Sequence, residues 1–290
     1  MNRCPICGAA VLADTCAACG FRPASIDGFV AFAPDLARAA PGYDPEHYRS
    51  LAELEAGNFW FRARNALILD ALARYFPAAQ SYLEIGCGTG YVLSAVAAER
   101  PTMAVHGSEI FVEGLAFAAQ RTPRATLFQM DARRLPFDAA FDVIGAFDVI
   151  EHIDEEREVL QELFRAVRPG GGVVLTVPQH PWLWSVQDDI AHHVRRYRRG
   201  EPESRLAEAG FKVVFSTSFV ALLLPALMLS RLGGDRAREA PHDPFREFRI
   251  PRWLDSTLAL MMRFERVLIH AGLRFPVGGS RLVVATKALA

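Results

Sequence analysis

The sequence lacks an excess of charge of either sign. Its 32 Lys and Arg residues are balanced by 33 Asp and Glu residues, which leaves a formal net charge of −1 over 290 residues. No overall field draws the chain to a polyanion, so we expect no DNA partner, and any basic surface must be local. Because 51% of the residues are hydrophobic and 22% are charged, disorder is not the dominant state.

A long uninterrupted apolar run is also missing. The most apolar stretch, Phe211–Leu229, contains a lysine, a proline and the run Ser216–Ser218, all of which a membrane-spanning helix disfavours. The first twenty residues contain cysteines, Pro5 and Asp14, where a secretory signal needs a continuous apolar region. We therefore expect a cytoplasmic protein, or one that is peripheral on the inner membrane face.

Cysteine is scarce after residue 19, where only Cys87 remains. The other four form two CxxC pairs, each followed by glycine, namely Cys4, Cys7, Cys16 and Cys19. Four soft ligands at this spacing are typical of a zinc ribbon with a structural Zn²⁺ ion. The alternatives are two disulfides, which the lack of a secretory signal disfavours, and a redox CxxC pair, which needs one motif opening a helix.

The chain divides into two predicted domains. Residues 1–40 form the zinc ribbon and a Pro- and Gly-bearing linker, and residues 41–290 form a larger domain with an insertion at about 220–279. A ribbon this small has little core, so the metal would supply most of its folding free energy.

From residue 81 onward, short β-prone runs alternate with helical ones. This rhythm predicts an α/β fold in which a mostly parallel sheet has helices on both faces. We expect strands at 81–85, 103–108, 125–130, 141–147, 172–177, 211–219 and 281–287, and helices at 59–76, 89–99, 111–121, 155–168 and 201–210. Such a sheet binds its ligand at the carboxyl ends of its strands.

The loop after the first of these strands has glycine at positions 86, 88 and 90. Glycines let a ligand lie directly on the backbone at the start of a helix. A dinucleotide fingerprint would require glycine in place of Tyr91, and the lysine of a Walker loop is absent. Glu84 would repel a pyrophosphate but would bind a ligand amino group, so the loop favours a cationic cofactor.

Two further acids follow the next two strands. Glu109 is placed where a carboxylate accepts both hydrogen bonds of a ribose diol, and Asp131 is placed where one accepts from an adenine amino group. Each alone is consistent with a solvated loop acid. Together with Glu84 they predict an adenosine-bearing ligand.

Three runs, Tyr82–Gly90, Phe141–Ile153 and Arg168–Gly172, together with Glu109 and Asp131, resemble class I S-adenosylmethionine-dependent methyltransferases. The resemblance covers about residues 59–219. It implies a Rossmann-like sheet of seven strands in the order 3-2-1-4-5-7-6, with an antiparallel seventh strand. It also implies S-adenosylmethionine as the cofactor.

The resemblance implies a set of cofactor contacts. Glu84 would lie near the methionine amino end, Glu109 and Ile110 at the ribose, and Asp131 and Ala132 at the adenine edge. The other contacts implied are Gly86, Cys87, Gly88 and Gly90 against the cofactor backbone, and Phe147 and Asp148 near the sulfonium. Cys87 is interpreted as a small loop residue and not as a nucleophile.

Segments outside the cofactor half select the acceptor in this family, and here they are residues 59–65, 178–199 and 220–279. One of them, Pro178–Trp184 followed by Asp188, His193, Arg195, Arg196 and Tyr197, resembles small-molecule and glycolipid-pathway members of the type 11 and 12 groups. The acceptor contacts that we predict are Trp60, Arg64, Trp182, Arg196 and Tyr197. For Trp182, packing in the core is the alternative.

A hydroxyl or carboxyl acceptor can need a general base. His193 is the first candidate and His152 the second, because imidazole removes protons near neutral pH. A helix-capping role for His152 and a surface position for His193 are the alternatives.

A basic cluster at residues 195–199 suits an acceptor phosphate or carboxylate, anionic lipid or RNA, and a solvated helix face is the ordinary explanation. Two apolar segments, 220–229 and 256–273, are typical of core helices or a homodimer contact. Peripheral contact with a membrane that holds the acceptor is the alternative.

The main prediction is methyl transfer to oxygen or nitrogen of a small-molecule or lipid-linked acceptor. Methylation of a ribosomal RNA base is an alternative, since some guanine-modifying members begin with a zinc ribbon. The near-neutral charge and the absence of an Asn/Asp-Pro-Pro-Tyr/Phe motif argue against it. A second alternative is a zinc-ribbon interaction protein that binds the cofactor without turnover.

Overall fold

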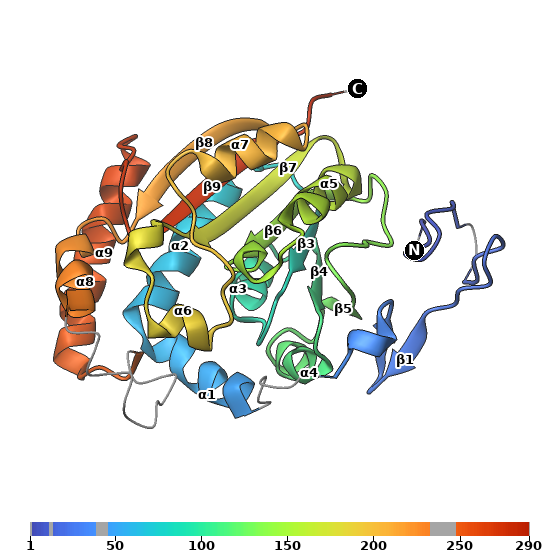
Figure 1. The fold of residues 1–290 in the computed structure, drawn as a ribbon, viewed down its shortest axis with the longest axis horizontal. Coiled ribbons are helices and arrows are strands. Elements are labelled where there is room, and N and C mark those ends of the chain that lie inside the picture. Colours follow the sequence, from blue (N-terminus) through green and yellow to red (C-terminus); the bar gives the residue numbers. More distant parts are fainter. Residues whose placement is uncertain (1, 12–13, 39–45, 233–247, 290) are drawn as a thin grey trace.

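The structure is a computed structural model that describes residues 2–11, 14–38, 46–232 and 248–289. A single sheet crosses the molecule, with helices on both of its faces (Figure 1). The sheet has nine strands in the order β1-β2-β5-β4-β3-β6-β7-β9-β8. Their bounds are Ala24–Ile26, Phe29–Ala31, Ser81–Ile85, Ala104–Glu109, Thr126–Gln129, Phe141–Phe147, Val167–Pro178, Lys212–Phe219 and Ser280–Thr286 for β1 to β9.

The seven strands from β3 to β9 confirm the predicted order. β5, β4, β3, β6 and β7 pair in parallel in that order, whereas β9 lies antiparallel between β7 and β8. The chain therefore has the mostly parallel Rossmann-like sheet that the alternating pattern predicts.

The predicted strand count is wrong by two, because the segment assigned to the linker forms a β-hairpin. Asp27 and Gly28 both adopt positive φ, +51° and +87°, and connect β1 to β2 in a two-residue turn. β2 then pairs in parallel with β5, placing Val30 opposite Phe128. The Asp-Gly hairpin signal was present in the sequence, but the strands on either side are only three residues long.

The α-helices, in chain order, are α1 Glu46–Leu54, α2 Phe59–Tyr75, α3 Tyr91–Glu99, α4 Val112–Arg121, α5 Glu156–Ala166, α6 Val186–Ile190, α7 Glu201–Glu208, α8 Leu224–Leu232 and α9 Arg252–His270. Asn58 caps α2 by accepting a hydrogen bond from the backbone N–H of Trp60 at 2.9 Å. This cap fixes where the helix begins, and with it the direction in which Trp60 and Arg64 project.

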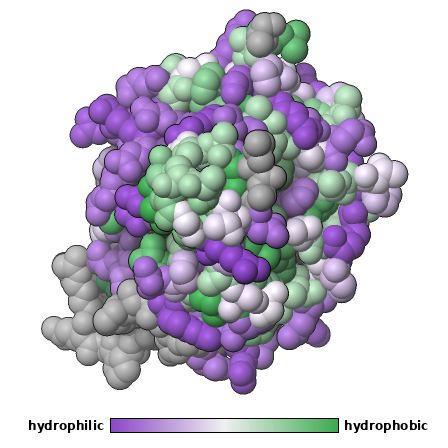
Figure 2. Space-filling model, turned by 90° about the vertical axis from the view of Figure 1, so that its right-hand side faces the viewer, coloured by the Kyte–Doolittle hydropathy of each residue, from purple (hydrophilic) through white to green (hydrophobic). Residues whose placement is uncertain are grey.

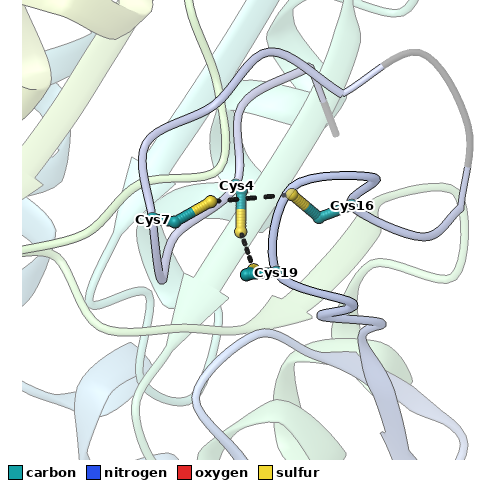
Figure 3. A group of neighbouring side chains, drawn as sticks. All are labelled: Cys4, Cys7, Cys16 and Cys19. Atoms are coloured by element: carbon teal, nitrogen blue, oxygen red, sulfur yellow. Dashed lines mark hydrogen bonds between the residues drawn. The ribbon is translucent and has the colours of Figure 1, made fainter.

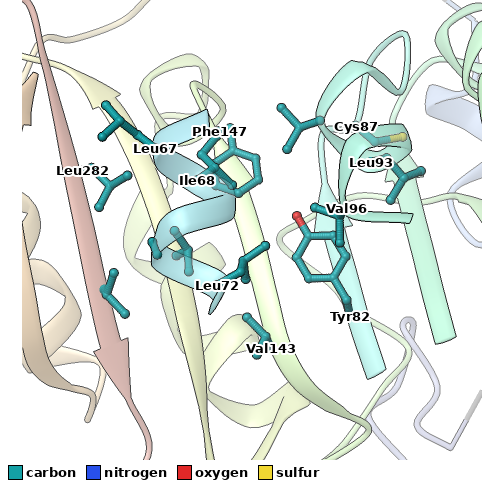
Figure 4. Close-up of a cluster of buried hydrophobic side chains, with 14 of the residues drawn as sticks. Leu67, Ile68, Leu72, Tyr82, Cys87, Leu93, Val96, Val143, Phe147 and Leu282 are labelled. Atoms are coloured by element: carbon teal, nitrogen blue, oxygen red, sulfur yellow. The ribbon is translucent and has the colours of Figure 1, made fainter. Parts of the chain in front are cut away.

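Successive residues of the central strands face opposite sides of the sheet and form two cores. Tyr82 belongs to the core under α2, α3, α4 and α9, while the next residue, Leu83, belongs to the core under α5 and α7. Figure 4 shows Leu67, Ile68 and Leu72 of α2 between Leu282 on one side and Tyr82 on the other. The sheet is thus buried on both faces, which leaves its carboxyl edge for ligands.

The N-terminal segment packs on one edge of this sheet. Asn2 exchanges hydrogen bonds of 2.7 Å with the backbone of Asp138, and its own backbone N–H donates to the carbonyl of Pro136. Figure 2 shows this face of the molecule, where apolar side chains gather in the middle and hydrophilic ones surround them. Phe32, just after β2, is buried in the core under α5.

At the other end of the molecule, α9 packs on α2 (Figure 1). Met262 and Ile269 face inward, and Arg266 forms an ion pair with Asp70 of α2. The outer face of α9 exposes Trp253 and Phe264. Among the described residues, no helix has both the length and the apolar character that crossing a membrane requires.

Candidate active site

The glycine loop after β3 lies against two other elements. Gly86 has a φ of +63°, and a Cβ placed there would lie 2.6 Å from Cγ2 of Val149, which follows β6. A Cβ on Gly90, with a φ of +77°, would lie 2.8 Å from the backbone of Ala118 in α4. Both positions therefore require glycine, for space and for backbone conformation.

Glu109 connects this loop to the end of β4. Its carboxylate accepts hydrogen bonds from the backbone N–H groups of Gly88 at 3.0 Å and Ile110 at 2.8 Å. Burial raises the pKa of Glu109, and these hydrogen bonds oppose the rise. The backbone N–H of Phe111 also donates to this carboxylate at 3.4 Å, and the Tyr48 side chain hydrogen-bonds to it. Since a carboxylate has about four acceptor positions, a ligand hydroxyl group would share or replace one of these partners.

Glu84 lies in β3, and only 3% of its surface is exposed. The hydroxyl of Tyr82 donates a hydrogen bond of 3.0 Å to its carboxylate. Burial raises the pKa of Glu84 to about 8, so this carboxyl is protonated in most molecules at neutral pH. An ammonium group of a ligand would compensate the buried charge.

Asp131 follows β5 and has a partner that sequence reasoning missed. Arg133 donates to it through Nε, at 3.0 Å to each oxygen, and through its backbone N–H at 2.9 Å. Ala132 beside it is buried. A ligand amino group at this position would have to share the Asp131 carboxylate with the Arg133 guanidinium.

Asp148 brings the end of β6 to helix α2. It adopts a φ of +56° and forms an ion pair with Arg64. The Arg64 guanidinium carbon lies 4.6 Å from the centre of the Trp60 ring. The structure therefore places two predicted acceptor residues beside a predicted cofactor residue, while Phe147 packs in the core under α2.

The two candidate bases lie next to each other. The ring centres of His152 and His193 are 4.7 Å apart. His193 Nδ1 lies 2.8 Å from Oδ1 of Asp188, and Arg196 Nε donates to the same oxygen at 2.6 Å. Burial alone would raise the pKa of Asp188, but the hydrogen bonds from His193 and Arg196 lower it to about 2. Asp188 is therefore a carboxylate that orients both side chains.

Glu151 is a second residue that sequence analysis did not select, although it lies in the run that carries the family resemblance. It is fully buried, and its carboxyl oxygens have no hydrogen-bond partner in the part of the chain that the structure describes. Burial raises the pKa of Glu151 well above its usual range. The backbone N–H of Val194 donates to the Glu151 carbonyl at 2.8 Å, which joins the loop after β6 to the segment that carries His193.

Other buried polar atoms near the ends of β6 and β7 also have no partner among the described residues. They are Thr176 Oγ1, both amide atoms of Gln179, His180 Nε2 and Asn65 Oδ1. His180 adopts a φ of +65° where the chain leaves β7. Buried polar groups are normally satisfied, so this side of the sheet suits a polar ligand.

The remaining predicted acceptor residues have different surroundings. Tyr197 is fully buried in the core under α5, where its hydroxyl donates to Glu156 at 2.5 Å, so it anchors the segment 178–199. Trp182 is 55% exposed and stacks on His180, with ring centres 4.9 Å apart.

The basic cluster is divided between two roles. Arg195 and Arg196 form ion pairs with the buried carboxylates Glu156 and Asp188. Arg198 and Arg199 line a surface hollow of about 600 Å³ together with Arg205, Glu201 and Glu208, among others. This hollow thus carries charges of both signs.

The four N-terminal cysteines converge as a tetrathiolate site requires (Figure 3). Sγ of Cys4 lies 3.6 Å from that of Cys19, and Sγ of Cys7 lies 3.6 Å from that of Cys16. A disulfide would need about 2.05 Å, whereas the sulfurs of a zinc tetrahedron with Zn–S bonds of about 2.3 Å lie about 3.8 Å apart. The geometry therefore fits zinc and not two disulfides.

The fold and the glycine loop define the class of the protein, a Rossmann-like domain of the methyltransferase type. A solved phosphoethanolamine N-methyltransferase 2 of Haemonchus contortus, in complex with S-adenosyl-L-methionine, has this fold. Its TM-score is 0.57 at 20% identity, and the match covers 86% of this chain and 58% of the solved one.

A family model described as a methyltransferase domain matches residues 60–215, more than half of the chain, and the chain belongs to this family. A probable S-adenosylmethionine-dependent methyltransferase of Mycolicibacterium smegmatis is 32% identical over 170 residues, 57% of this chain and 64% of the relative. A trans-aconitate 2-methyltransferase of Azoarcus is 28% identical over 170 residues, 58% of this chain and 61% of the relative. The chain thus spans less than two thirds of the length of these relatives.

Proposed function

We propose that this chain transfers the methyl group of S-adenosylmethionine to an oxygen or nitrogen atom of a small-molecule or lipid-linked acceptor. One observation carries the proposal: the buried acids Glu84 and Glu109 and the ion-paired Asp148 all lie around the loop from Gly86 to Gly90. Family membership and the names of the relatives support the same reaction.

The residues present fit this cofactor chemically. Glu84 would bind the amino group and Glu109 the ribose hydroxyl groups, while Asp131 with Ala132 would contact the adenine edge. The cofactor supplies a methyl carbon that is electrophilic because it is bonded to a sulfonium. Gly86 and Gly88, lacking side chains, leave their backbone open to it.

Methyl transfer by displacement requires alignment and exclusion of water more than covalent help from the protein. On the acceptor side, α2 contributes Trp60 and Arg64, and the segment after β7 contributes Trp182. The pairing of Arg64 with Asp148 holds that wall of the site against the cofactor side. We propose that the acceptor nucleophile faces the pair His152 and His193.

Small-molecule acceptors are favoured by the relatives, which include a trans-aconitate 2-methyltransferase and a 27-O-demethylrifamycin SV methyltransferase. The apolar outer face of α9 favours a lipid-linked member of that class, because it offers a surface for an apolar tail. The balanced charge of the chain gives no corresponding support to RNA.

We further propose that Cys4, Cys7, Cys16 and Cys19 hold a structural Zn²⁺ ion. The sulfur spacing supports this assignment. Among the ribbon residues that the structure describes, the core contains only Cys4, Val11 and Cys16 as buried hydrophobic residues, too few to fold the segment without a metal.

The test is a calorimetric titration with S-adenosylmethionine and S-adenosylhomocysteine, with NAD as the control ligand. The zinc content of the protein is measured beforehand. Micromolar binding of the first two, without binding of NAD, is the expected result. Incubation with methyl-labelled cofactor and a panel of hydroxy acids, amines and lipid extracts then identifies the acceptor. Binding of NAD alone would refute the cofactor assignment, and tight cofactor binding with no labelled product in any extract would refute turnover.

A further inference from the structure

The Glu151 carboxyl is a fully buried acid of the site, and neither of its oxygens has a hydrogen-bond partner among the described residues. Within the described part of the chain, no ion pair includes it either. Removing a carboxylate from water costs several kcal/mol unless a partner compensates it. The fold nevertheless holds it in place, since the Glu151 carbonyl accepts the N–H of Val194.

Two imidazoles, those of His152 and His193, lie close to Glu151. The charged side chains of Asp148, Arg64 and Arg196 also act electrostatically on its carboxyl group. A carboxylate oxygen of Glu151, a ring nitrogen of His152 and a ring nitrogen of His193 all lie within 4.8 Å of one another. The three residues come from two segments about 40 positions apart in the sequence, so the fold and not a local turn brings them together. Two imidazole nitrogens and one carboxylate oxygen are a common donor set for divalent transition metals.

The orientation of His193 is a separate observation. Its Nδ1 is hydrogen-bonded to Oδ1 of Asp188 at 2.8 Å, which leaves Nε2 as the atom that could bind a metal ion. Asp188 is itself buried and held by the Ser185 N–H at 2.8 Å and by Arg196. A carboxylate behind the second nitrogen is the usual support of a metal-binding histidine, because it fixes the ring and its tautomer.

From this arrangement we infer that Glu151, His152 and His193 bind a divalent metal ion on the acceptor side of the active site, distinct from the cysteine ribbon. Three protein ligands leave coordination positions open. The acceptor class that fits them is a molecule with two neighbouring oxygen donors, such as a vicinal dihydroxy or hydroxycarboxylate compound. This inference rests on the proposed methyl transfer and specifies its acceptor.

The chemistry of such a step balances without a further reactant. An acceptor hydroxyl bound at the cation becomes more acidic and releases its proton to water. An oxygen lone pair then forms the O–CH₃ bond, while the S–CH₃ bond breaks and its electron pair stays on sulfur, which yields the neutral thioether. In this arrangement His193 is a metal ligand and not the general base that the sequence suggests.

The test uses Mn²⁺ as the probe and the full chain with its cysteines loaded with zinc. Free Mn²⁺ is followed by its paramagnetic resonance signal during the titration, and we expect one saturable site per chain. Glu151→Gln and His193→Gln, which keep side-chain size, should each abolish it. Asp188→Asn should weaken Mn²⁺ binding by about tenfold to a hundredfold, as expected for a residue that positions a ligand.

His270→Gln is the matched control, since His270 is exposed at the end of α9, far from this cluster in the fold. It should bind Mn²⁺ as the unaltered chain does. Circular dichroism verifies that each variant is folded. If Glu151→Gln does not fold, His193→Gln alone provides the test of the metal site. No saturable Mn²⁺ site in the unaltered chain, or unchanged affinity in the folded Glu151 and His193 variants, would overturn the inference.

Calorimetry with S-adenosylmethionine on the same samples separates this inference from the proposed function. Cofactor binding with no Mn²⁺ site would remove the metal and leave the methyltransferase proposal intact. If the unaltered chain does not bind S-adenosylmethionine, the proposed function is refuted instead. Methyl transfer that persists in protein with one zinc ion per chain, held by the cysteines, and no other metal would return His193 to the role of base.

Discussion

The two halves of the carboxyl edge of the sheet differ in how their polar groups are satisfied. In the half formed by β3, β4 and β5, Glu109 accepts from Gly88 and Ile110, and Asp131 is paired with Arg133. In the half formed by β6 and β7, Glu151 and Gln179 have buried polar atoms without partners among the described residues. The first half is preorganised by its own hydrogen bonds, whereas the second depends on what binds there.

The largest expected effect breaks the preorganised half by steric clash. Gly86→Val would place a Cβ 2.6 Å from Val149 at a φ of +63°, so we expect a loss of about 2–5 kcal/mol in unfolding free energy and no measurable cofactor binding. Thermal unfolding and calorimetry measure the two quantities.

Gly200→Ala is the control for this substitution. Its φ is also positive, +83°, but a Cβ there would meet nothing within 4 Å. It should cost only about 1 kcal/mol and leave cofactor affinity unchanged. Cofactor binding that survives in Gly86→Val would show that the loop after β3 does not lie against the ligand.

The next effect extends the comparison to the ribbon, which contacts the preorganised half. Cys4→Ser with Cys7→Ser should release zinc, because a tetrathiolate needs all four ligands. Hydrogen exchange should rise in residues 24–38 and also in 131–138, since Asn2 hydrogen-bonds to Asp138 and the ring of Phe32 packs edge-on against that of Phe137. Residues 81–90 should keep their protection.

Metal analysis of the purified variant verifies the zinc loss. If exchange in 131–138 stays as slow as in the unaltered chain, the ribbon is an independent module that only touches the sheet edge. The ribbon would then have no effect on the loop that carries Asp131.

Much of this fold was predictable because its signals are local. The apolar strands are bounded by turn residues, and the strand predicted at 81–85 agrees with β3 in both limits. The hairpin at β1 and β2 was missed because its strands gain their stability from β5, about 100 residues away in the sequence. Gln129 of β5 bonds both backbone groups of Ala33, an interaction that no local pattern reveals.

The same distinction holds for the site. Glu84 and Glu109 were selected because they stand at fixed distances from a glycine loop, and both prove to be buried there. Glu151 and Asp188 were not selected, since an acid becomes notable only when it is known to be buried beside two histidines. The cofactor half is thus predictable from spacing, and the acceptor half requires tertiary structure.

A smaller effect measures how much one acid contributes to the preorganised half. Glu109→Ala should weaken S-adenosylmethionine binding by about 1.5–3 kcal/mol, the usual range for hydrogen bonds to a charged group. Glu109→Gln, which keeps an oxygen acceptor for the Gly88 N–H, should lose less. Calorimetry measures both, and equal affinity in all three proteins would refute the ribose assignment.

The smallest expected effect is the release of a proton from Glu84 when the cofactor binds. Burial raises the pKa of this carboxyl to about 8 in the free protein, so at pH 7 roughly nine in ten molecules carry the proton. Binding an ammonium group beside it favours the carboxylate, so the proton must leave and cofactor affinity must rise with pH up to about 8, then level off.

Titrations at pH 7 in two buffers of different ionisation enthalpy should show release of roughly one proton per cofactor. Glu84→Gln should bind more weakly and release none. Identical heats in both buffers for the unaltered chain would mean that the amino group of the cofactor lies elsewhere, and the cofactor half would then be preorganised for a different ligand orientation.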